Sequence, residues 1–291
     1  MIAVSAPPIA APSFPASAEI DAIIRVALAE DVGRGDITTE ATVSPETAAR
    51  AEILQKGAGV VCGLPVVAAV FSALDRRVRV TPTAAEGSFE AGRRAVAQID
   101  GPAAAILTGE RTALNFLQRL SGVATASRRA AQLVAGTRAR VIDTRKTTPG
   151  LRVLEKYAVR VGGASNHRAG LDDGFLIKEN HIRAAGGITP AVYAAQRRAA
   201  PGQVVEVEVT SLEELDEALE AGATLILLDN FSTEQMRAAV AQARGRARLE
   251  ASGGISLDNL ADVARTGVDY VSLGALTHSA GVLDFSLEVI A

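Results

Sequence analysis

Cysteine and lysine are both scarce in this sequence. A single cysteine, Cys62, stands among 291 residues, which excludes an intramolecular disulfide framework and a thiolate-rich metal site and fits a reducing, cytoplasmic location. There is no apolar run of about 18 residues, the length that a membrane span requires, so no span is expected. The net charge is only −3, so a nucleic-acid-binding surface is not expected either. Hydrophobic residues make up 48% of the chain, enough for a large globular core.

The first 18 residues lack charged side chains altogether. They contain four of the eleven prolines, and these prolines interrupt the only apolar run that could serve as the core of a secretory signal. We therefore expect residues 1–18 to form a disordered tail.

Two stretches with different patterns follow the tail. Residues 19–116 mix helical with short extended segments, which predicts an α+β sandwich domain whose sheet has one solvated face. Residues 117–278 contain strand-then-helix units, which indicate parallel strands joined by crossover helices and predict an α/β barrel. The C-terminal segment 279–291 is available to pack back on the first domain. The predicted elements are helices at 20–30 and 103–135, and extended segments at 50–55, 78–81, 95–100, 140–143 and 175–177.

The last four predicted strands, at 203–209, 224–228, 248–251 and 270–273, are followed by polar or glycine residues at a regular spacing. Glu208, Asp229, Ser252 and Gly274 are separated by 21, 23 and 22 residues. One strand with a return helix and two loops needs about that length, so these four positions should lie side by side at one rim. Functional residues from at least six consecutive strand ends favour a TIM-like barrel, open or incomplete, over a doubly wound sheet. The spacing leaves the number of strands open.

Helix starts between these strands are also marked. Ser211 with Glu214 and Ser232 with Gln235 have capping-box spacing, and Gly222 stands where a helix should end.

Cations gather in the loops of the predicted barrel. Arg145 and Lys146 lie between hydroxyl residues in one strand-to-helix loop, and Lys178 follows the next strand, a composition that suits an anionic ligand. A solvated basic turn is the alternative, but the chain has only four lysines, and two of them occupy these positions. His167 followed by Arg168 could bind carboxylates, although a structural histidine is common; zinc-ligand spacing is absent.

Carboxylates, opposite in charge to these cations, stand at the ends of two buried strands. Glu208 and Asp229 each need a partner there, either a structural cation or a ligand. As a functional pair they would coordinate a metal and stabilise a developing positive charge, and hard Mg²⁺ prefers such oxygen ligands.

Glycines complete the rim. Ser252, Gly253 and Gly254 follow one strand and are expected to open a helix directly, and Gly274 follows the next strand. Backbone N–H groups and a helix N-terminus at this point of a barrel would bind a phosphate, with a plain tight turn as the alternative.

Seven motifs follow one another in the chain: GERTALN at 109–115, DTRKTTPG at 143–150, NHR at 166–168, LIKENH at 176–181, EVEV at 206–209, LDN at 228–230 and EASGGI at 250–255. Together they resemble those of the quinolinate phosphoribosyltransferase family, and the resemblance covers the chain from about residue 19 to the C-terminus.

The resemblance implies transfer of phosphoribosyl from 5-phosphoribosyl 1-pyrophosphate to quinolinate with decarboxylation, using Mg²⁺ and no organic cofactor, to give nicotinate mononucleotide for NAD synthesis. It implies a homodimer with composite sites, in which Arg111 enters the neighbouring subunit's site. By this resemblance the quinolinate carboxylates are bound by Arg145, His167, Arg168 and Lys178, and the pyrophosphate by Lys146 and Lys178. The ribose and the metal are bound by Glu208 and Asp229. The 5-phosphate is bound by Ser252, Gly253, Gly254 and Gly274, and the pocket is lined by His278.

Three alternatives stay open. A paralogous branch associated with molybdenum transport shares the Arg-Lys-Thr and His-Arg motifs, but the segment Lys178 to His181 favours quinolinate. A Schiff-base lyase acting on a sugar phosphate could use Lys146 or Lys178. A non-catalytic binder of nucleotides or sugar phosphates would need no acid pair.

Overall fold

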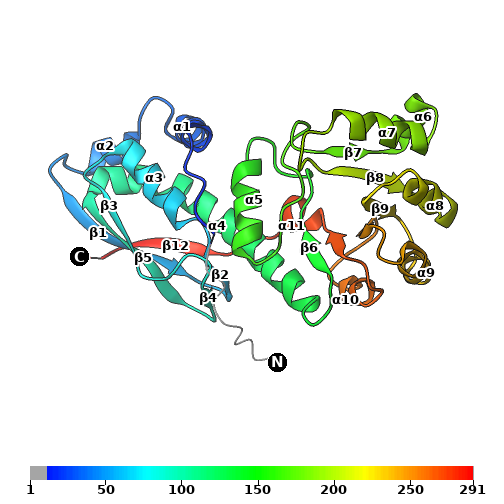
Figure 1. Ribbon diagram of the computed structural model, residues 1–291. Coiled ribbons are helices and arrows are strands. Elements are labelled where there is room, and N and C mark those ends of the chain that lie inside the picture. Colours follow the sequence, from blue (N-terminus) through cyan, green and yellow to red (C-terminus); the bar gives the residue numbers. More distant parts are fainter. Residues whose placement is uncertain (1–11, 291) are drawn as a thin grey trace. The chain divides into compact units, whose positions relative to one another are not determined.

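The computed structural model describes residues 12–290, which divide into two compact units (Figure 1). The first unit combines residues up to Arg128 with 148–163 and the segment from Ser279 onward, and the second combines 129–147 with 164–278. The expected domain limits stay a prediction. Most of the predicted tail, residues 1–11, lies outside the described residues; Phe14, in the described part, packs its ring edge-on against Tyr157, with centroids 5.3 Å apart.

The first two helices of the first unit begin at residues whose side chains cap them. Ser17 accepts a hydrogen bond from the Ile20 N–H, and Asp36 accepts one from the Thr39 N–H at 3.0 Å. The helices that contribute to this unit are α1 (Ala18–Val32), α2 (Ile37–Thr42), α3 (Leu64–Leu74), α4 (Ala103–Leu133) and α5 (Arg152–Val161).

A four-stranded antiparallel sheet forms the other layer of this unit. Its order is β12-β1-β5-β3, so the last strand of the chain pairs with the first. Burial alternates along β1, where Ala51 and Ile53 are fully buried between more exposed neighbours, and Ile99 of β5 joins them in the core. The strand bounds are β1 (Ala48–Gln55), β3 (Arg79–Pro82), β5 (Arg94–Pro102) and β12 (Phe285–Ile290), with a separate pair β2 (Gly59–Val60) and β4 (Phe89–Glu90). The predicted α+β layer with a one-sided sheet is confirmed.

The second unit is built on a six-stranded parallel sheet in the order β6-β11-β10-β9-β8-β7. The strands are β6 (Arg140–Ile142), β7 (Phe175–Ile177), β8 (Val205–Val209), β9 (Leu225–Asp229), β10 (Arg248–Ser252) and β11 (Tyr270–Ser272). The last strand lies beside the first, which is the order of a barrel rather than of a doubly wound sheet. One further parallel bridge, between Ile142 and Ser165, extends the ladder past β6. Within the described residues β6 and β7 do not pair with each other, so the predicted TIM-like, open barrel is confirmed.

Return helices follow the strands much as the capping residues predict. Ser211 caps its helix through the Glu214 N–H at 3.2 Å, and Ser232 forms a reciprocal capping box with Gln235. Gly222 has a φ of +79°, as expected just after a helix end. The helices are α6 (Glu179–Ala185), α7 (Ile188–Arg198), α8 (Leu212–Glu220), α9 (Thr233–Ala243), α10 (Leu260–Ala264) and α11 (Ala275–His278).

One predicted helix start is wrong. Residues 252–256 do not open a helix directly after β10, because α10 begins only at Leu260. Side chains in the intervening turns take the local hydrogen bonds: Asn259 Oδ1 accepts from the Ser256 N–H at 2.9 Å, and its Nδ2 donates to the Gly254 carbonyl. A helix N-terminus is therefore not part of this glycine turn.

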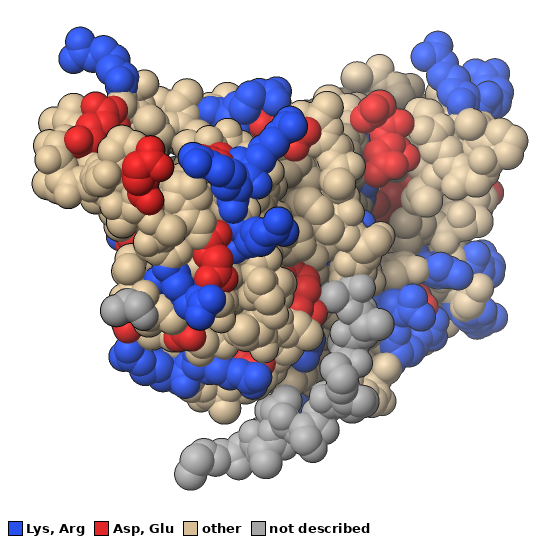
Figure 2. All heavy atoms as spheres, turned by 90° about the vertical axis from the view of Figure 1, so that its left-hand side faces the viewer, with Lys and Arg blue, Asp and Glu red and all other residues tan. Residues whose placement is uncertain are grey.

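Charges of both signs are interspersed on the face that Figure 2 shows. Pairs on the first unit include Arg50 with Asp100 at 2.6 Å and Arg93 with Glu288 at 3.0 Å. Such mixing gives a solvated surface rather than a field of one sign. From residue 12 to residue 290, none of the helices combines the length and the apolar character that crossing a membrane requires.

Candidate active site

The rim residues predicted from spacing stand at the carboxyl ends of neighbouring parallel strands. Asp229 ends β9 and Ser252 ends β10, and the two are direct partners in the ladder. Glu208 lies on the adjacent strand β8, Lys178 follows β7, and Gly274 follows β11. Arg145 and Lys146 follow β6, which is the neighbour of β11. The second unit therefore brings these residues to one edge of its sheet.

Opposite charges meet at this edge. Lys178 Nζ lies 3.0 Å from Glu208 Oε2, in an ion pair whose lysine side chain is half exposed. Burial raises the pKa of Asp229, and the negative charge of Glu208 raises it further, whereas Asn230, Lys178 and Lys146 lower it. Two hard carboxylates that repel each other are a fitting donor set for a magnesium ion, which would offset that repulsion.

The glycine turn after β10 is shaped by Asn230. Asn230 adopts a φ of +58°, its N–H donates to the Ser252 carbonyl at 2.9 Å, and its side-chain amide donates to Asp229 Oδ2 at 2.8 Å. A Cβ on Gly253 would collide with Asn230 Oδ1, and Gly253 itself has a φ of +87°. Only glycine fits there, and the backbone lies open to a ligand at Gly254, where a Cβ would meet nothing within 4 Å.

A second glycine brings Lys146 and His278 together. A Cβ on Gly274 would lie 3.1 Å from the His278 ring and 3.1 Å from Lys146 Cδ. The Thr277 hydroxyl also donates to the Lys146 carbonyl at 2.8 Å. The loops after β6 and β11 are thus held against each other, with the lysine, the glycine and the histidine in one place.

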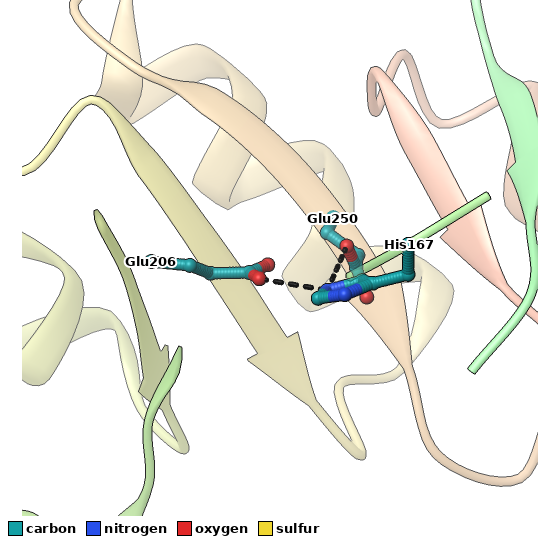
Figure 3. A group of neighbouring side chains, drawn as sticks. All are labelled: His167, Glu206 and Glu250. Carbon is teal, nitrogen blue, oxygen red and sulfur yellow. Dashed lines mark hydrogen bonds and ion pairs between the residues drawn. The ribbon is translucent and has the colours of Figure 1, made fainter. Parts of the chain in front are cut away.

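His167 joins a buried cluster that the sequence analysis did not assemble (Figure 3). Its Nε2 lies 2.9 Å from Glu206 Oε2 and 3.6 Å from Glu250 Oε2. Both glutamate side chains are almost completely buried, on β8 and β10. Burial and the charge of Glu206 raise the pKa of Glu250 well above its ordinary value.

The hydrogen bonds of His167 define its tautomer. The Arg168 N–H donates to His167 Nδ1 at 2.7 Å, so Nδ1 carries the lone pair and Nε2 carries the proton that Glu206 accepts. The three side chains could bracket a metal ion by distance, since their ligand atoms lie within 4.8 Å of one another. A metal on Nε2 would need the lone pair there, and the other ring nitrogen would then have to donate. We therefore interpret the cluster as hydrogen-bonded.

Asp143 holds the loop that carries Asn166 and His167. It is fully buried directly after β6, where Oδ1 accepts from the His167 N–H at 2.8 Å and Oδ2 accepts from the Asn166 amide at 2.7 Å. Arg168 donates to the Gly174 carbonyl at 2.9 Å, and burial together with the charge of Arg145 lowers its pKa. Asp143 stands inside a motif that the sequence analysis quoted, but no local pattern revealed its buried role.

Sequence reasoning also missed Asn230 as a part of the site and Glu250 as a part of the buried cluster beneath it. Glu250 could have been found, because it precedes Ser252 by two positions on its strand, as Glu206 precedes Glu208. His181 accepts a hydrogen bond from the Lys178 N–H at 3.0 Å and so caps α6. Arg111 is exposed on α4 in the first unit, and its side chain makes no hydrogen bond or ion pair with any other residue in the described range.

Family models match nearly the whole chain. The model "Quinolinate phosphoribosyl transferase, N-terminal domain" matches residues 36–121, and the corresponding C-terminal domain model matches residues 123–288. The chain belongs to the quinolinate phosphoribosyl transferase family. The resemblance inferred from the motifs is thereby confirmed.

Individual relatives agree with the family models. The chain is 44% identical to a probable nicotinate-nucleotide pyrophosphorylase [carboxylating] of Bacillus subtilis, covering 89% of this chain and 90% of that protein. It is 45% identical to the nicotinate-nucleotide pyrophosphorylase [carboxylating] of Mycobacterium leprae, covering 91% and 95%. A solved structure of the nicotinate-nucleotide pyrophosphorylase from Francisella tularensis has a TM-score of 0.89 at 41% identity, covering 94% of this chain and 96% of that one.

Proposed function

We propose that this protein transfers phosphoribosyl from 5-phosphoribosyl 1-pyrophosphate to the ring nitrogen of quinolinate and releases CO₂, pyrophosphate and nicotinate mononucleotide, a step of NAD synthesis. The observation that carries the proposal is the rim of the second unit, where cations, a carboxylate pair and an open glycine turn meet. Family membership supports the same reaction.

Quinolinate carries two adjacent carboxylates, one of which is next to the ring nitrogen. The loops after β6 and β7 and the segment just before β7 offer cations for them. Arg145, Arg168 and Lys178 would bind the carboxylates, Arg168 through its planar guanidinium, and His167 would face the same side. A ring held in this way is presented to the ribose carbon in a fixed orientation, which supplies proximity.

The phosphorylated substrate fits the remaining rim. Its 5-phosphate would accept hydrogen bonds from the turns at Ser252, Gly253, Gly254 and Gly274, with His278 lining the pocket. Lys146 and Lys178 would neutralise the pyrophosphate, and the contact of Lys146 with the Gly274 loop supports their common use.

Glu208 and Asp229 would bind the ribose hydroxyls and hold Mg²⁺. When bound, this ion supplies charge neutralisation for the pyrophosphate. As the bond between the ribose carbon and pyrophosphate breaks, positive charge develops on the ribose, and the two carboxylates stabilise it. The ring nitrogen then forms the new bond. Loss of CO₂ leaves an electron pair beside the positive ring nitrogen, where a proton replaces the carboxylate without an organic cofactor.

Two copies of the chain would complete each site. The exposed Arg111 side chain, which has no hydrogen-bond or ion-pair partner among residues 12–290, is available to a neighbouring subunit, which supports a homodimer with composite sites. Neither a nucleic acid nor a membrane is proposed as a partner, and a cytoplasmic location stays a prediction from the cysteine content.

The decisive experiment incubates purified protein with Mg²⁺, phosphoribosyl pyrophosphate and either quinolinate or nicotinate, and follows CO₂ and nicotinate mononucleotide. Product from quinolinate alone is expected. Product from neither acceptor would contradict the proposal and favour the molybdenum-associated branch or a binder. Borohydride trapping of a sugar phosphate on Lys146 or Lys178 would instead indicate a Schiff-base lyase.

A further inference from the structure

A polar layer lies one step below the proposed substrate rim. Glu206 precedes Glu208 by two residues on β8, and Glu250 precedes Ser252 by two residues on β10, so each glutamate projects from the same face of its strand as the rim residue above it. Both carboxylates point at the His167 ring (Figure 3). The interior positions that usually hold branched aliphatic side chains in such barrels are polar here.

His167 is held within this layer from several directions. Glu206 Oε2 lies at hydrogen-bond distance from Nε2, the Arg168 N–H donates to Nδ1, and Asp143 accepts the His167 main-chain N–H. Glu250 lies 3.6 Å from Nε2, beyond a hydrogen bond. Glu206 is therefore the carboxylate that fixes the orientation and tautomer of the ring.

We propose that Glu206 is a positioning residue for substrate binding, because it fixes the His167 ring. His167 Nδ1 in turn holds the main chain of Arg168, so that the Arg168 guanidinium faces a carboxylate of the acceptor. The inference rests on the proposed function, since that acceptor is quinolinate. Glu206 contacts neither substrate and acts only through His167 and Arg168.

Two replacements of Glu206 separate positioning from packing. Glu206→Gln keeps an oxygen that accepts the Nε2 proton, and its amide would take the place of Oε1, a buried atom that has no hydrogen-bond partner in the described structure. Glu206→Leu fills similar space but leaves the His167 N–H without an acceptor. Glu250→Gln is the matched control, because it changes the same cluster without removing a hydrogen bond from His167.

Steady-state kinetics with both substrates provide the main test. Glu206→Leu is expected to raise the KM for quinolinate about tenfold or more while the KM for phosphoribosyl pyrophosphate stays within about twofold. Glu206→Gln and Glu250→Gln should both stay within about twofold of wild type for both substrates. In a His167→Ala background Glu206→Leu should have no further effect on quinolinate, because the residue through which it acts is gone.

Several results would overturn the proposal: equal changes in both KM values, no change in either, or a Glu206→Gln variant as impaired as Glu206→Leu. If Glu206→Leu does not fold, Glu206→Ala must show the same quinolinate-specific change, and its absence would equally overturn the proposal.

NMR of the histidine nitrogens gives a test that needs no substrate. The chain has three histidines, so the signal of His167 is assigned as the one that is missing from a His167→Gln variant. Wild-type His167 should carry its proton on Nε2, and a proton on Nδ1 would overturn the inference. Wild-type protein with this tautomer but without turnover of quinolinate would refute the proposed function, and the positioning role with it, while leaving the Glu206 contact in place.

Discussion

At the scale of single residues, two adjacent glycines occupy the same kind of turn but differ in what surrounds them. A Cβ on Gly253 would collide with the Asn230 side chain, whereas a Cβ on Gly254 would meet nothing within 4 Å, and both have positive φ. A side chain at either position would therefore carry the strain of a left-handed backbone, about 1 kcal/mol, but only a side chain at position 253 would also collide with Asn230.

Gly253→Ala should accordingly damage the proposed phosphate site more than Gly254→Ala. We expect Gly253→Ala to raise the KM for phosphoribosyl pyrophosphate about tenfold or more, because Asn230 must move away from Asp229, and Gly254→Ala to raise it severalfold at most. Kinetics of the two variants side by side measure the difference. Equal effects would show that backbone strain, and not the Asn230 contact, dominates.

Lys146 gives the second residue-scale prediction. Lys146→Ala should lower kcat by about a thousandfold or more, because the departing pyrophosphate loses a positive charge at the site where negative charge accumulates. Its denaturant midpoint should match that of wild type, since the side chain belongs to the ligand rim. Near-normal turnover would refute the role assigned to this lysine.

The residue scale also shows where sequence reasoning stops. Lys146, Glu208 and Asp229 could be predicted because their position after a strand and their charge are both visible in the sequence. Asn230 could not, because its importance comes from a left-handed backbone conformation and from a glycine on the next strand. Such close approaches between neighbouring loops have no signature in local sequence.

At the scale of elements, α4 and α5 are joined by a buried ion pair. Arg119 donates to Glu155 Oε1 through Nε and through a terminal nitrogen, at 2.9 and 2.7 Å, and the Glu155 side chain is fully buried. Glu155 also accepts from the N–H and hydroxyl of Thr148, and Arg119 donates to the Ala280 carbonyl. One pair therefore anchors two helices and two loops of the first unit.

Arg119→Leu should lower the free energy of unfolding by about 3–5 kcal/mol, because it leaves the buried Glu155 carboxylate without its cation. Denaturant titration measures this loss. Arg77→Leu is the control, since the Arg77–Asp75 pair is exposed and its removal should hardly change stability. A loss at Arg119 no larger than that of the control would contradict the anchoring role.

The start of α3 gives a pH-dependent prediction. Glu86 accepts from the Gly63 and Leu64 N–H groups and from the Tyr157 hydroxyl, and so caps a helix that has no cap of its own. Burial nevertheless raises the pKa of Glu86 above its ordinary value of 4.5. The folded state thus holds this proton more tightly than the unfolded state, so the contribution of Glu86 to stability falls as pH rises from about 4.5 through the folded-state pKa.

Glu86→Gln removes that titration. The stability of wild type relative to Glu86→Gln should therefore decrease as pH rises through this window, as measured by denaturant unfolding at a series of pH values. A difference that grows with pH would show that ionised Glu86 is favoured in the folded protein, and a constant difference would show that folding does not shift its pKa. Either result would contradict the prediction.

Secondary-structure elements were predictable where an apolar period and a cap coincide. The strands that carry Glu208 and Asp229 lie within a residue or two of their predicted bounds, and Ser232 marks its helix start. The turn after Ser252 misled prediction because glycine, serine and asparagine there satisfy one another and delay the helix to Leu260.

At the scale of the whole molecule, the composite site predicts complementation between inactive variants. Arg111→Ala and Lys146→Ala subunits should each form nearly inactive homodimers, whereas mixing them should restore part of the activity, because a hybrid dimer contains one site with both residues intact. Activity after verified subunit exchange is the measurement. No recovery would refute the assignment of Arg111 to the neighbouring site.

The first unit also combines both ends of the described chain. β12 at residues 285–290 covers the edge of β1, and a Cβ on Gly122 of α4 would collide with the Gly281 carbonyl, so the returning segment lies directly against that helix. This arrangement bears on how the protein is made. β1 is synthesised long before its edge partner β12, so during translation the backbone groups of β1 on that side stay unpaired until residues 285–290 have left the ribosome. A prematurely terminated chain would keep that edge exposed and would be prone to aggregate.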